Sequence, residues 1–578
     1  MKKVFQEVCK FKKELIVIIV TVIGSTMCTL GLPSLISNII NTDIPNEDFG
    51  GILRTGGFML ILVVVGILCG IVTSHASAIV SMGVGKSLRS QIFKKVQYFS
   101  QTEFDKFSTS SLITRTNNDV TQVQNFLNQC LRIAFQAPIM FFGAIGLTLS
   151  KSLTLSSILV VSMPVVVLVI WLLARKAVPL STAIQKKIDR INLVMREKLT
   201  GVRVIRAFGT TEFETKKFNS INEDYKNTNM KMQRITGALI PGLTLVIAFT
   251  AIGIMLLGER GLVHGREYQI GDIIAIIQYV MQVLLSVMML SMIVILYPRA
   301  STAAKRAQEL LSTQLSILDK EDIVKKETGL RGYLKFDNVS FTYPGAQEPA
   351  IKNISFEAKP GETTAIIGGT GMGKSTIVNL IPRFYDVTQG AVLVDGIDVR
   401  DYKQEDLRKK IGMVPQKAVL FTGTIESNIR FGDENATEER IEKAADISQS
   451  TDFILKKAEG FNAPISQGGS NVSGGQRQRL SIARAVVRKP EIYIFDDSFS
   501  ALDFKTDKKL RAALAEETQN ATVVIVAQRV STIMEADRIL VLENGSCVGM
   551  GTHKELLKTC EVYKEIVRSQ MSEEEMKK

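Results

Sequence analysis

Residues 363–381 read TTAIIGGTGMGKSTIVNLI, an apolar stretch, a glycine-rich loop and a second apolar stretch. The first stretch is typical of a buried strand and the second of a helix. The loop between them fits the spacing GxxxxGK[ST] and consists of Gly368, Gly369, Thr370, Gly371, Met372, Gly373, Lys374, Ser375 and Thr376. In such a loop, backbone N–H groups converge on phosphate oxygens at a helix N-terminus, the lysine neutralises the outer phosphates and the serine hydroxyl ligates Mg²⁺. The segment therefore predicts a phosphate-binding site.

Two motifs further along the chain also suit phosphate chemistry. The stretch IYIFDD at 492–497 is a buried-strand pattern that delivers Asp496 and Asp497 to the strand's C-terminal end, and Asp496 is the expected magnesium partner. Between the loop and this strand, NVSGGQRQRLSIARA at 471–485 places SGGQ before a basic amphipathic helix. An exposed helix N-terminus binds phosphate well, although SGGQ taken alone is equally a turn and a helix cap.

Length, composition and charge point to a membrane protein with more than one domain. The 578 residues are 46% hydrophobic, which excludes a disordered chain. Residues 1–333 hold 37 Lys and Arg against 22 Asp and Glu, and the remainder holds 33 against 35. The cations flank apolar runs, as the positive-inside bias predicts, so no nucleic-acid partner is expected. The six cysteines have no CxxC spacing and predict neither a zinc site nor a disulfide framework.

Six apolar runs are long enough to cross a hydrocarbon core of about 30 Å. They lie at approximately 15–40, 52–84, 134–149, 153–174, 235–257 and 270–296. The third run is short, and we expect a helix extending upstream to supply the missing turns. An even number of spans places both termini on one side, and Lys/Arg-rich connections near 85–133 and 175–234 predict that this side is cytoplasmic. These connections keep helical apolar spacing, which predicts membrane helices that continue into the cytosol.

Three features of the membrane half have two readings each. Apolar residues at near-helical spacing among lysines predict an interfacial helix over 1–13, and a frayed terminus is the alternative. His75 and Arg132 are ionisable groups within or beside the spans, where burying charge is expensive. They are either cavity-lining substrate contacts or, as we prefer, a neutral hydrogen-bonded histidine and an arginine that extends to the cytoplasmic boundary.

Taken together, the soluble motifs resemble the nucleotide-binding domain of ATP-binding cassette (ABC) proteins over about 334–570. The resemblance implies that Tyr343 stacks on adenine, that Gln416 in MVPQ is the loop glutamine, that Val472–Gln476 is the signature and that 500–503 is the D-loop. It implies ATP and Mg²⁺ as cofactors, the metal being held by Ser375, Gln416 and Asp496. It also implies contacts to an ATP bound on a second chain, made by Ser473, Gly474, Gly475, Gln476 and Asp503.

The whole chain resembles an exporter-type half-transporter, in which two chains pair and each ATP lies between one chain's phosphate loop and the other's signature. The implied fold is a membrane α-helical domain of six transmembrane helices with long cytosolic extensions, followed by an α/β P-loop ABC nucleotide-binding domain. The expected bounds are 1–13 for the interfacial helix, 14–310 for the transmembrane domain, 311–333 for a linker, 334–570 for the nucleotide-binding domain and 571–578 for a tail. The segments 110–120 and 202–214 fall where this family has coupling helices. This makes Asn117, Asp119, Phe208 and Gly209 candidate motor contacts, with ordinary cytosolic turns as the alternative.

Two positions depart from the family pattern. The residue after the magnesium-binding aspartate is usually glutamate, which acts on the attacking water, and here it is Asp497. The switch motif usually has histidine, and here VVIVAQRVST has Gln528. Aspartate is one methylene shorter and glutamine cannot carry a proton as imidazole can, so this site is expected to bind ATP but hydrolyse it slowly. This resembles the degenerate-site chain of heterodimeric bacterial multidrug exporters.

The sequence therefore predicts one subunit of an ATP-driven exporter of amphipathic small molecules, either drugs or lipid-like compounds. The expected partner is a second half-transporter with Glu and His at the matching positions, whose hydrolytic site this chain's signature completes. The expected location is a bacterial plasma membrane, in contact with lipid, with both termini and the nucleotide-binding domain in the cytoplasm. An ATP-gated channel or sensor with incidental hydrolysis is the alternative, and a peptide exporter stays possible. The six spans exclude a soluble ABC ATPase.

Overall fold

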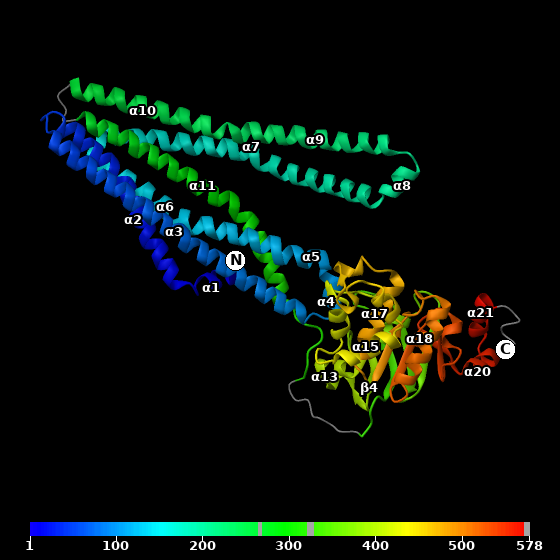
Figure 1. Cartoon of the computed structure of the whole chain (residues 1–578). Coiled ribbons are helices and arrows are strands. Elements are labelled where there is room, and N and C mark those ends of the chain that lie inside the picture. Colours follow the sequence, from blue (N-terminus) through cyan, green and yellow to red (C-terminus); the bar gives the residue numbers. More distant parts are fainter. Residues whose placement is uncertain (264–268, 321–328, 572–578) are drawn as a thin grey trace. The chain divides into compact units, whose positions relative to one another are not determined.

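The computed structural model describes residues 1–263, 269–320 and 329–571, and the chain divides into two compact units (Figure 1). The membrane unit comprises Met1–Gln97 and Ser110–Thr313, and the motor unit comprises Tyr98–Thr109 and Gln314–Lys578. The predicted tail at 571–578 lies outside the described residues except for Met571.

The membrane unit is built entirely from helices in the part of the chain described. Their bounds are α1 Lys2–Val8, α2 Lys12–Asn38, η1 Ile39–Asp43, α3 Phe49–Gln97, α5 Thr109–Thr114, η2 Arg115–Asp119, α6 Val120–Lys151, α7 Leu153–Thr200, α8 Val202–Ala207, α9 Thr211–Gly237, α10 Leu239–Val263 and α11 Ile270–Ser312. Six continuous helical stretches among these residues are long and apolar enough to cross a membrane, which confirms the predicted number of spans. The third stretch, Thr109–Lys151, does extend upstream of its short apolar run.

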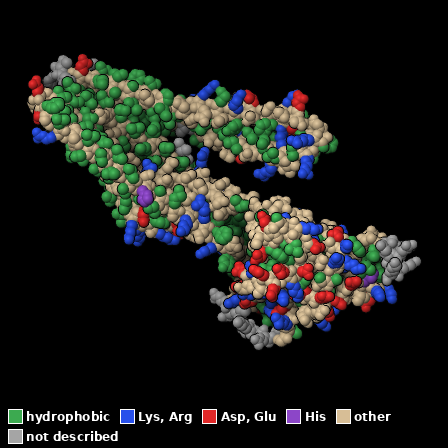
Figure 2. Space-filling model, viewed as in Figure 1, with side chains coloured by type: hydrophobic (Ala, Val, Ile, Leu, Met, Phe, Trp, Pro, Cys, Tyr) green, Lys and Arg blue, Asp and Glu red, His purple; other side chains and the backbone are tan. Residues whose placement is uncertain are grey.

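The long helices pack in two groups. Helix α2 lies against α3 and α6 against α11, while α7 lies against α9 and α10 (Figure 1). Hydrophobic side chains cover much of the outer surface of this unit (Figure 2), as hydrocarbon surroundings require. At its N-terminus, residues 2–8 are helical, and Glu7 accepts hydrogen bonds from Ser87 and Gln91 of α3.

The motor unit contains a six-stranded sheet in the order β12-β11-β3-β10-β9-β6 and a four-stranded sheet in the order β2-β1-β4-β5. The strands are β1 Leu334–Phe341, β2 Ile351–Ala358, β3 Thr363–Gly368, β4 Gln389–Val394, β5 Ile397–Asp398, β6 Ile411–Val414, β7 Gly423–Thr424, β8 Pro464–Ile465, β9 Ile492–Asp496, β10 Thr522–Val526, β11 Arg538–Glu543 and β12 Ser546–Gly551. The helices are α4 Gln101–Phe107, α12 Lys374–Leu380, α13 Gln404–Lys409, α14 Ile425–Arg430, α15 Glu438–Ile447, α16 Thr451–Leu455, α17 Gly474–Val487, α18 Phe504–Glu517, α19 Val530–Ile533, α20 His553–Thr559 and α21 Glu561–Gln570.

The strand order positions the chemistry of the motor unit. Strands β6, β9, β10 and β3 are neighbours and run parallel, with Val414 opposite Phe495, and Val526 opposite both Asp496 and Ile366. The carboxyl ends of parallel neighbours meet at one edge of a sheet. The residues that follow these strands are therefore brought together, although they are distant in sequence.

The first predicted coupling segment, residues 110–120, lies in the membrane unit, and its contact with a motor domain stays a prediction. Residues 110–120 belong to one long helical stretch, and Asp119 is buried in an ion pair with Arg306 of α11 (Nη2 to Oδ1, 2.6 Å), while Asn117 is exposed. The short helix α4 belongs to the motor unit, where Asp105 accepts a hydrogen bond from Tyr385 at 3.1 Å. Ser100 and Glu103 form a capping box that begins α4, and this S-x-x-E signal was available in the sequence.

The second predicted segment, residues 202–214, forms helix α8, a turn and the start of α9. Phe208 is 78% exposed, and Gly209 has φ +65° with open space around its Cα. Contact of these two residues with a motor domain stays a prediction.

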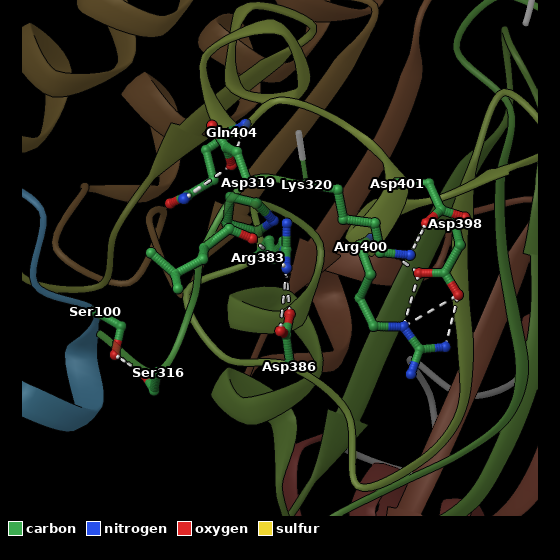
Figure 3. A network of polar contacts seen from close by, with 12 residues as sticks. Ser100, Ser316, Asp319, Lys320, Arg383, Asp386, Asp398, Arg400, Asp401 and Gln404 are labelled. Carbon is green, nitrogen blue, oxygen red and sulfur yellow. Dashed lines mark hydrogen bonds and ion pairs between the residues drawn. The ribbon is translucent and has the colours of Figure 1, made fainter. Parts of the chain in front are cut away.

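Residues 314–320, here called the strap, contact both α4 and the rest of the motor unit (Figure 3). Ser316 donates its backbone N–H to Glu103 at 3.0 Å, and its hydroxyl shares a hydrogen bond with Ser100. Farther along the strap, Asp319 accepts two bonds from Gln404, and Lys320 pairs with Asp401. The strap is therefore hydrogen-bonded to α4 at one end and to the rest of the motor unit at the other.

Substituting Glu103 is expected to loosen this attachment. Burial opposes ionisation of Glu103, but hydrogen bonds from Ser100 and Ser316 outweigh it and lower its pKa. Glu103→Gln presents an NH₂ group to these donors, and loss of the charged acceptor should speed hydrogen exchange in residues 98–109 by about tenfold. The attachment should also weaken as pH falls from the usual carboxyl value of 4.5 through the lowered pKa, because protonation removes the acceptor charge. The exposed Gln101→Ala on the same turn is the control, and equal exchange in both variants would contradict the assignment.

Candidate functional site

The glycine-rich loop leads from β3 into the N-terminus of α12, as the sequence predicts. Gly373 immediately precedes the helix with φ +89°, and an added Cβ would lie 2.7 Å from the carbonyl oxygen of Ala350. A residue with a side chain is therefore excluded there by both conformation and space. The backbone N–H groups at the start of α12 are left free of intrahelical partners, which is the condition for binding an anion.

Lys374 folds back over the loop. Its Nζ donates to the carbonyl oxygens of Gly368 and Gly369 at 2.8 and 2.7 Å. Burial lowers the pKa of Lys374, and the nearby charges of Asp497 and Asp496 oppose this effect. The ammonium group is thus held beside the loop by weak acceptors that phosphate oxygens can replace.

Asp496 and Ser375 form the candidate metal pair. Ser375 Oγ donates to Asp496 Oδ1 at 3.2 Å, and Asp496 is 6% exposed at the end of β9. Burial and the neighbouring Asp497 raise the pKa of Asp496 despite the hydrogen bond from Ser375. A buried carboxylate beside a hydroxyl is an oxygen donor set that fits Mg²⁺, whose charge would offset the cost of burial.

Asp497 is engaged by two side-chain amides. Gln528 Nε2 donates to Asp497 Oδ2 at 2.8 Å, and Gln416 Nε2 donates to the same oxygen at 3.2 Å. Gln416 follows β6, Asp497 follows β9 and Gln528 follows β10, so the parallel strand order brings the three together. One oxygen of the carboxylate that stands where a hydrolytic base is expected therefore already accepts two hydrogen bonds.

A pocket of about 320 Å³ unites most of the predicted cofactor residues. Its lining comprises Tyr343, Ala350, Thr370, Gly371, Gly373, Lys374, Ser375, Thr376, Gln416, Asp496, Asp497, Val526 and Gln528. Ala350 and Val526 were not predicted, because only the tertiary structure brings them to the pocket. The predicted residues Gly368, Gly369 and Met372 belong to the loop but not to this lining.

Tyr343 borders the pocket from the segment after β1. Its hydroxyl shares a hydrogen bond with Thr376 at 3.0 Å, and its ring packs edge-on against Phe341 and Tyr385. The ring is thus fixed beside the phosphate loop. Stacking on adenine stays a prediction.

The predicted signature residues lie away from this pocket. Ser473 caps α17 in a reciprocal capping box with Gln476, and an added Cβ on Gly475 would lie 3.1 Å from the carbonyl oxygen of Ala501. Asp503 caps α18 by accepting the N–H of Thr506 at 3.0 Å. None of Ser473, Gly474, Gly475, Gln476 and Asp503 lines the pocket as described. The N-terminus of α17 is exposed, so it can bind an anion that is not bound in this pocket.

Comparison with known families agrees with both units. Residues 15–288 match the ABC transporter transmembrane region, and residues 351–500 match the ABC transporter family. An uncharacterized ABC transporter ATP-binding protein of Mycobacterium tuberculosis (strain CDC 1551 / Oshkosh) is 38% identical over 568 residues, covering 98% of this chain and 97% of the relative. The chain belongs to the ABC transporter family, as a fused membrane domain and ATPase whose family couples ATP hydrolysis to transport.

Two further similarities concern relatives with more informative names. The ATP-dependent lipid A-core flippase of Aliivibrio fischeri is 30% identical over 576 residues, covering 99% of this chain and 98% of the flippase. The structure of a bacterial Atm1-family ABC exporter with ATP bound superposes with a TM-score of 0.80 at 24% identity, covering 97% of this chain and 99% of that one. This likeness confirms the predicted fold class, an exporter-type membrane domain joined to an ABC nucleotide-binding domain.

Proposed function

We propose that this chain is one subunit of an ATP-driven exporter, and that its own phosphate loop belongs to a degenerate site that binds ATP and hydrolyses it slowly. The carrying observation is the engagement of Asp497 Oδ2 by both Gln416 and Gln528. A general base must reach the water it activates with a free lone pair in the right direction. In Asp497 the two amide donors take up Oδ2, and the side chain is one methylene shorter than that of glutamate, so the carboxylate is poorly placed for that task.

Within the proposed site, each side chain has a role that its position supports. Lys374 and the N–H groups at the start of α12 bind the phosphates, and Tyr343 bounds the pocket on the adenine side. Ser375, Asp496 and Gln416 would hold Mg²⁺, which would neutralise negative charge on the phosphates. Gln528 donates a hydrogen bond but cannot take up a proton, so it positions without acting as acid or base.

A second chain is part of the proposal. The signature Ser473–Gln476 lies outside the chain's own pocket, which supports a role in completing a site on a partner. If that partner has Glu and His at the matching positions, its site performs the hydrolysis. Exposed apolar side chains around α8 support docking of this region on a partner, namely Leu199, Val204, Phe208 and Phe213.

The proposed substrate is an amphipathic small molecule, either drug-like or lipid-like. A cavity of about 340 Å³ lies among α2, α3 and α6, with walls that are part apolar and part polar, as an amphipathic ligand requires. Arg132 and Gln136 line it together with the hydroxyls of Ser25 and Thr29. Arg132 therefore borders a cavity, which favours the substrate-contact reading over simple extension to the boundary. The flippase relative, whose name refers to a lipid, supports the same class.

The proposed location is a bacterial plasma membrane with both termini and the motor unit in the cytoplasm. The Lys/Arg-rich segments of α3 and α7 support this orientation. An ATP-gated channel or sensor is the second candidate, favoured by Asp497 and Gln528 alone. The intact signature favours transport, since completing a hydrolytic site has little use in a sensor.

The decisive experiment compares ATP turnover of the purified chain alone and together with its candidate partner in lipid nanodiscs. We expect turnover only in the pair. It should collapse when the partner's phosphate-loop lysine is replaced and should survive Asp497→Asn in this chain. Brisk turnover by the chain alone, abolished by Asp497→Asn, would instead make Asp497 a working base and the protein a homodimeric pump.

A further inference from the structure

One side chain of helix α21 contacts the segment Gln528–Val530 after β10, which we call the switch loop. Gln570 Nε2 donates to the carbonyl oxygen of Gln528 at 2.8 Å, and the N–H of Val530 donates to Gln570 Oε1 at 2.8 Å. The amide of Gln570 thus uses both its donor and its acceptor on the peptide groups that flank Arg529. A primary amide satisfies this pattern in one orientation only.

The second of these bonds caps a helix. Val530 begins α19, whose N-cap Arg529 supplies no side-chain acceptor. The first N–H groups of a helix need a partner from outside the helix. Gln570 supplies that partner from 40 residues further along the chain.

Helix α21 is a firm support for this side chain. Tyr563 and Val567 are fully buried in the core of the motor unit, and the Tyr563 hydroxyl is hydrogen-bonded to His553 Nδ1 at 2.8 Å. The last turn of the helix therefore holds Gln570 at a fixed place. Gln570 itself is exposed at the surface, and its side chain bonds to the switch loop.

Gln528 connects this contact to the nucleotide pocket, because its backbone bonds to Gln570 and its side chain lines the pocket. The backbone that Gln570 holds carries the side chain that donates to Asp497 at 2.8 Å and lines the pocket. We propose that Gln570 is a positioning residue, which fixes the switch loop so that Gln528 faces Asp497 and the bound nucleotide. The packing of helix α21 and the binding of ATP are then coupled, so that each favours the other.

The inference rests on the ATP-binding part of the proposed function and not on slow hydrolysis. The test uses the full chain in its membrane assembly with Gln570→Ala and with Gln570→Met, which keeps the length but removes both polar groups. Ser569→Ala on the same turn is the control, since Ser569 bonds only within α21 through Ile566. The probes are hydrogen exchange of the segment containing Val530 and the ATP dissociation constant at this chain's site.

We expect both Gln570 variants to exchange the Val530 amide about tenfold faster and to bind ATP roughly three- to tenfold more weakly, which corresponds to the loss of one or two hydrogen bonds. Saturating ATP should slow exchange in residues 561–571 of the wild type but not of the variants. An unchanged unfolding midpoint in the Gln570 variants would show that the substitutions affect the position of the switch loop and not the stability of the fold. Unchanged exchange at Val530, or unchanged ATP affinity despite faster exchange, would overturn the role of Gln570. Failure of the wild type to bind ATP would overturn the proposed function itself.

Discussion

Combining Asp497→Glu with Gln528→His is expected to raise ATP hydrolysis at this chain's own site by at least about tenfold, since a well-placed base contributes roughly 10²- to 10⁴-fold. Asp497 now accepts hydrogen bonds from Gln528 and Gln416 at 2.8 and 3.2 Å. The longer glutamate carries its carboxylate beyond these donors toward the pocket. The histidine replaces the amide donor of Gln528 by an imidazole, which can carry a proton.

The measurement requires that all ATP hydrolysis come from the site built on this chain's own phosphate loop. We would therefore assay the assembly in which the partner's phosphate-loop lysine has been replaced, and compare the wild-type chain with each single variant and the double variant. Asp497→Asn is the matched control, because it keeps the size of the side chain and removes the base. A double variant no faster than this control would show that these two positions do not limit hydrolysis.

Removing the ammonium group of Lys374 is expected to weaken ATP binding by roughly 10- to 100-fold, the usual range for charged hydrogen bonds to phosphate. Lys374 lies at the start of α12 and lines the same pocket as Ser375 and Asp496. In Lys374→Met the carbonyl groups of Gly368 and Gly369 lose their donor, and the phosphates lose their nearest cation. The loss should appear in the ATP dissociation constant of the purified chain.

Lys359→Ala provides the control for the change in net charge. Lys359 is exposed in the segment after β2 and does not line the pocket. The expected outcome is normal affinity in this variant and a large loss in Lys374→Met. Equal affinity in both would mean that ATP binds elsewhere, and the proposed site would fail with it.

Much of the architecture was predictable because its signals are local. The phosphate loop is a continuous motif, and the six spans are continuous apolar runs, so neither depends on distant contacts. The packing of α4 in the motor unit was not predicted, although the capping box at Ser100 and Glu103 marks the start of this helix. A cap identifies a helix but not the surface on which it packs, and that depends on Ser316 and Tyr385, more than 200 residues away.

The sequence by itself determined the class of protein, its ATP-binding loop and the two unusual residues Asp497 and Gln528. Only the tertiary structure decided what those residues touch. Gln416, Asp497 and Gln528 meet because β6, β9 and β10 are parallel neighbours whose carboxyl ends share one edge of the sheet. Gln570 reaches the backbone of Gln528 because the buried face of α21 fixes that helix against the core. Hydrogen bonds between residues far apart in the chain depend on strand order and helix packing, and no local pattern in the sequence encodes them.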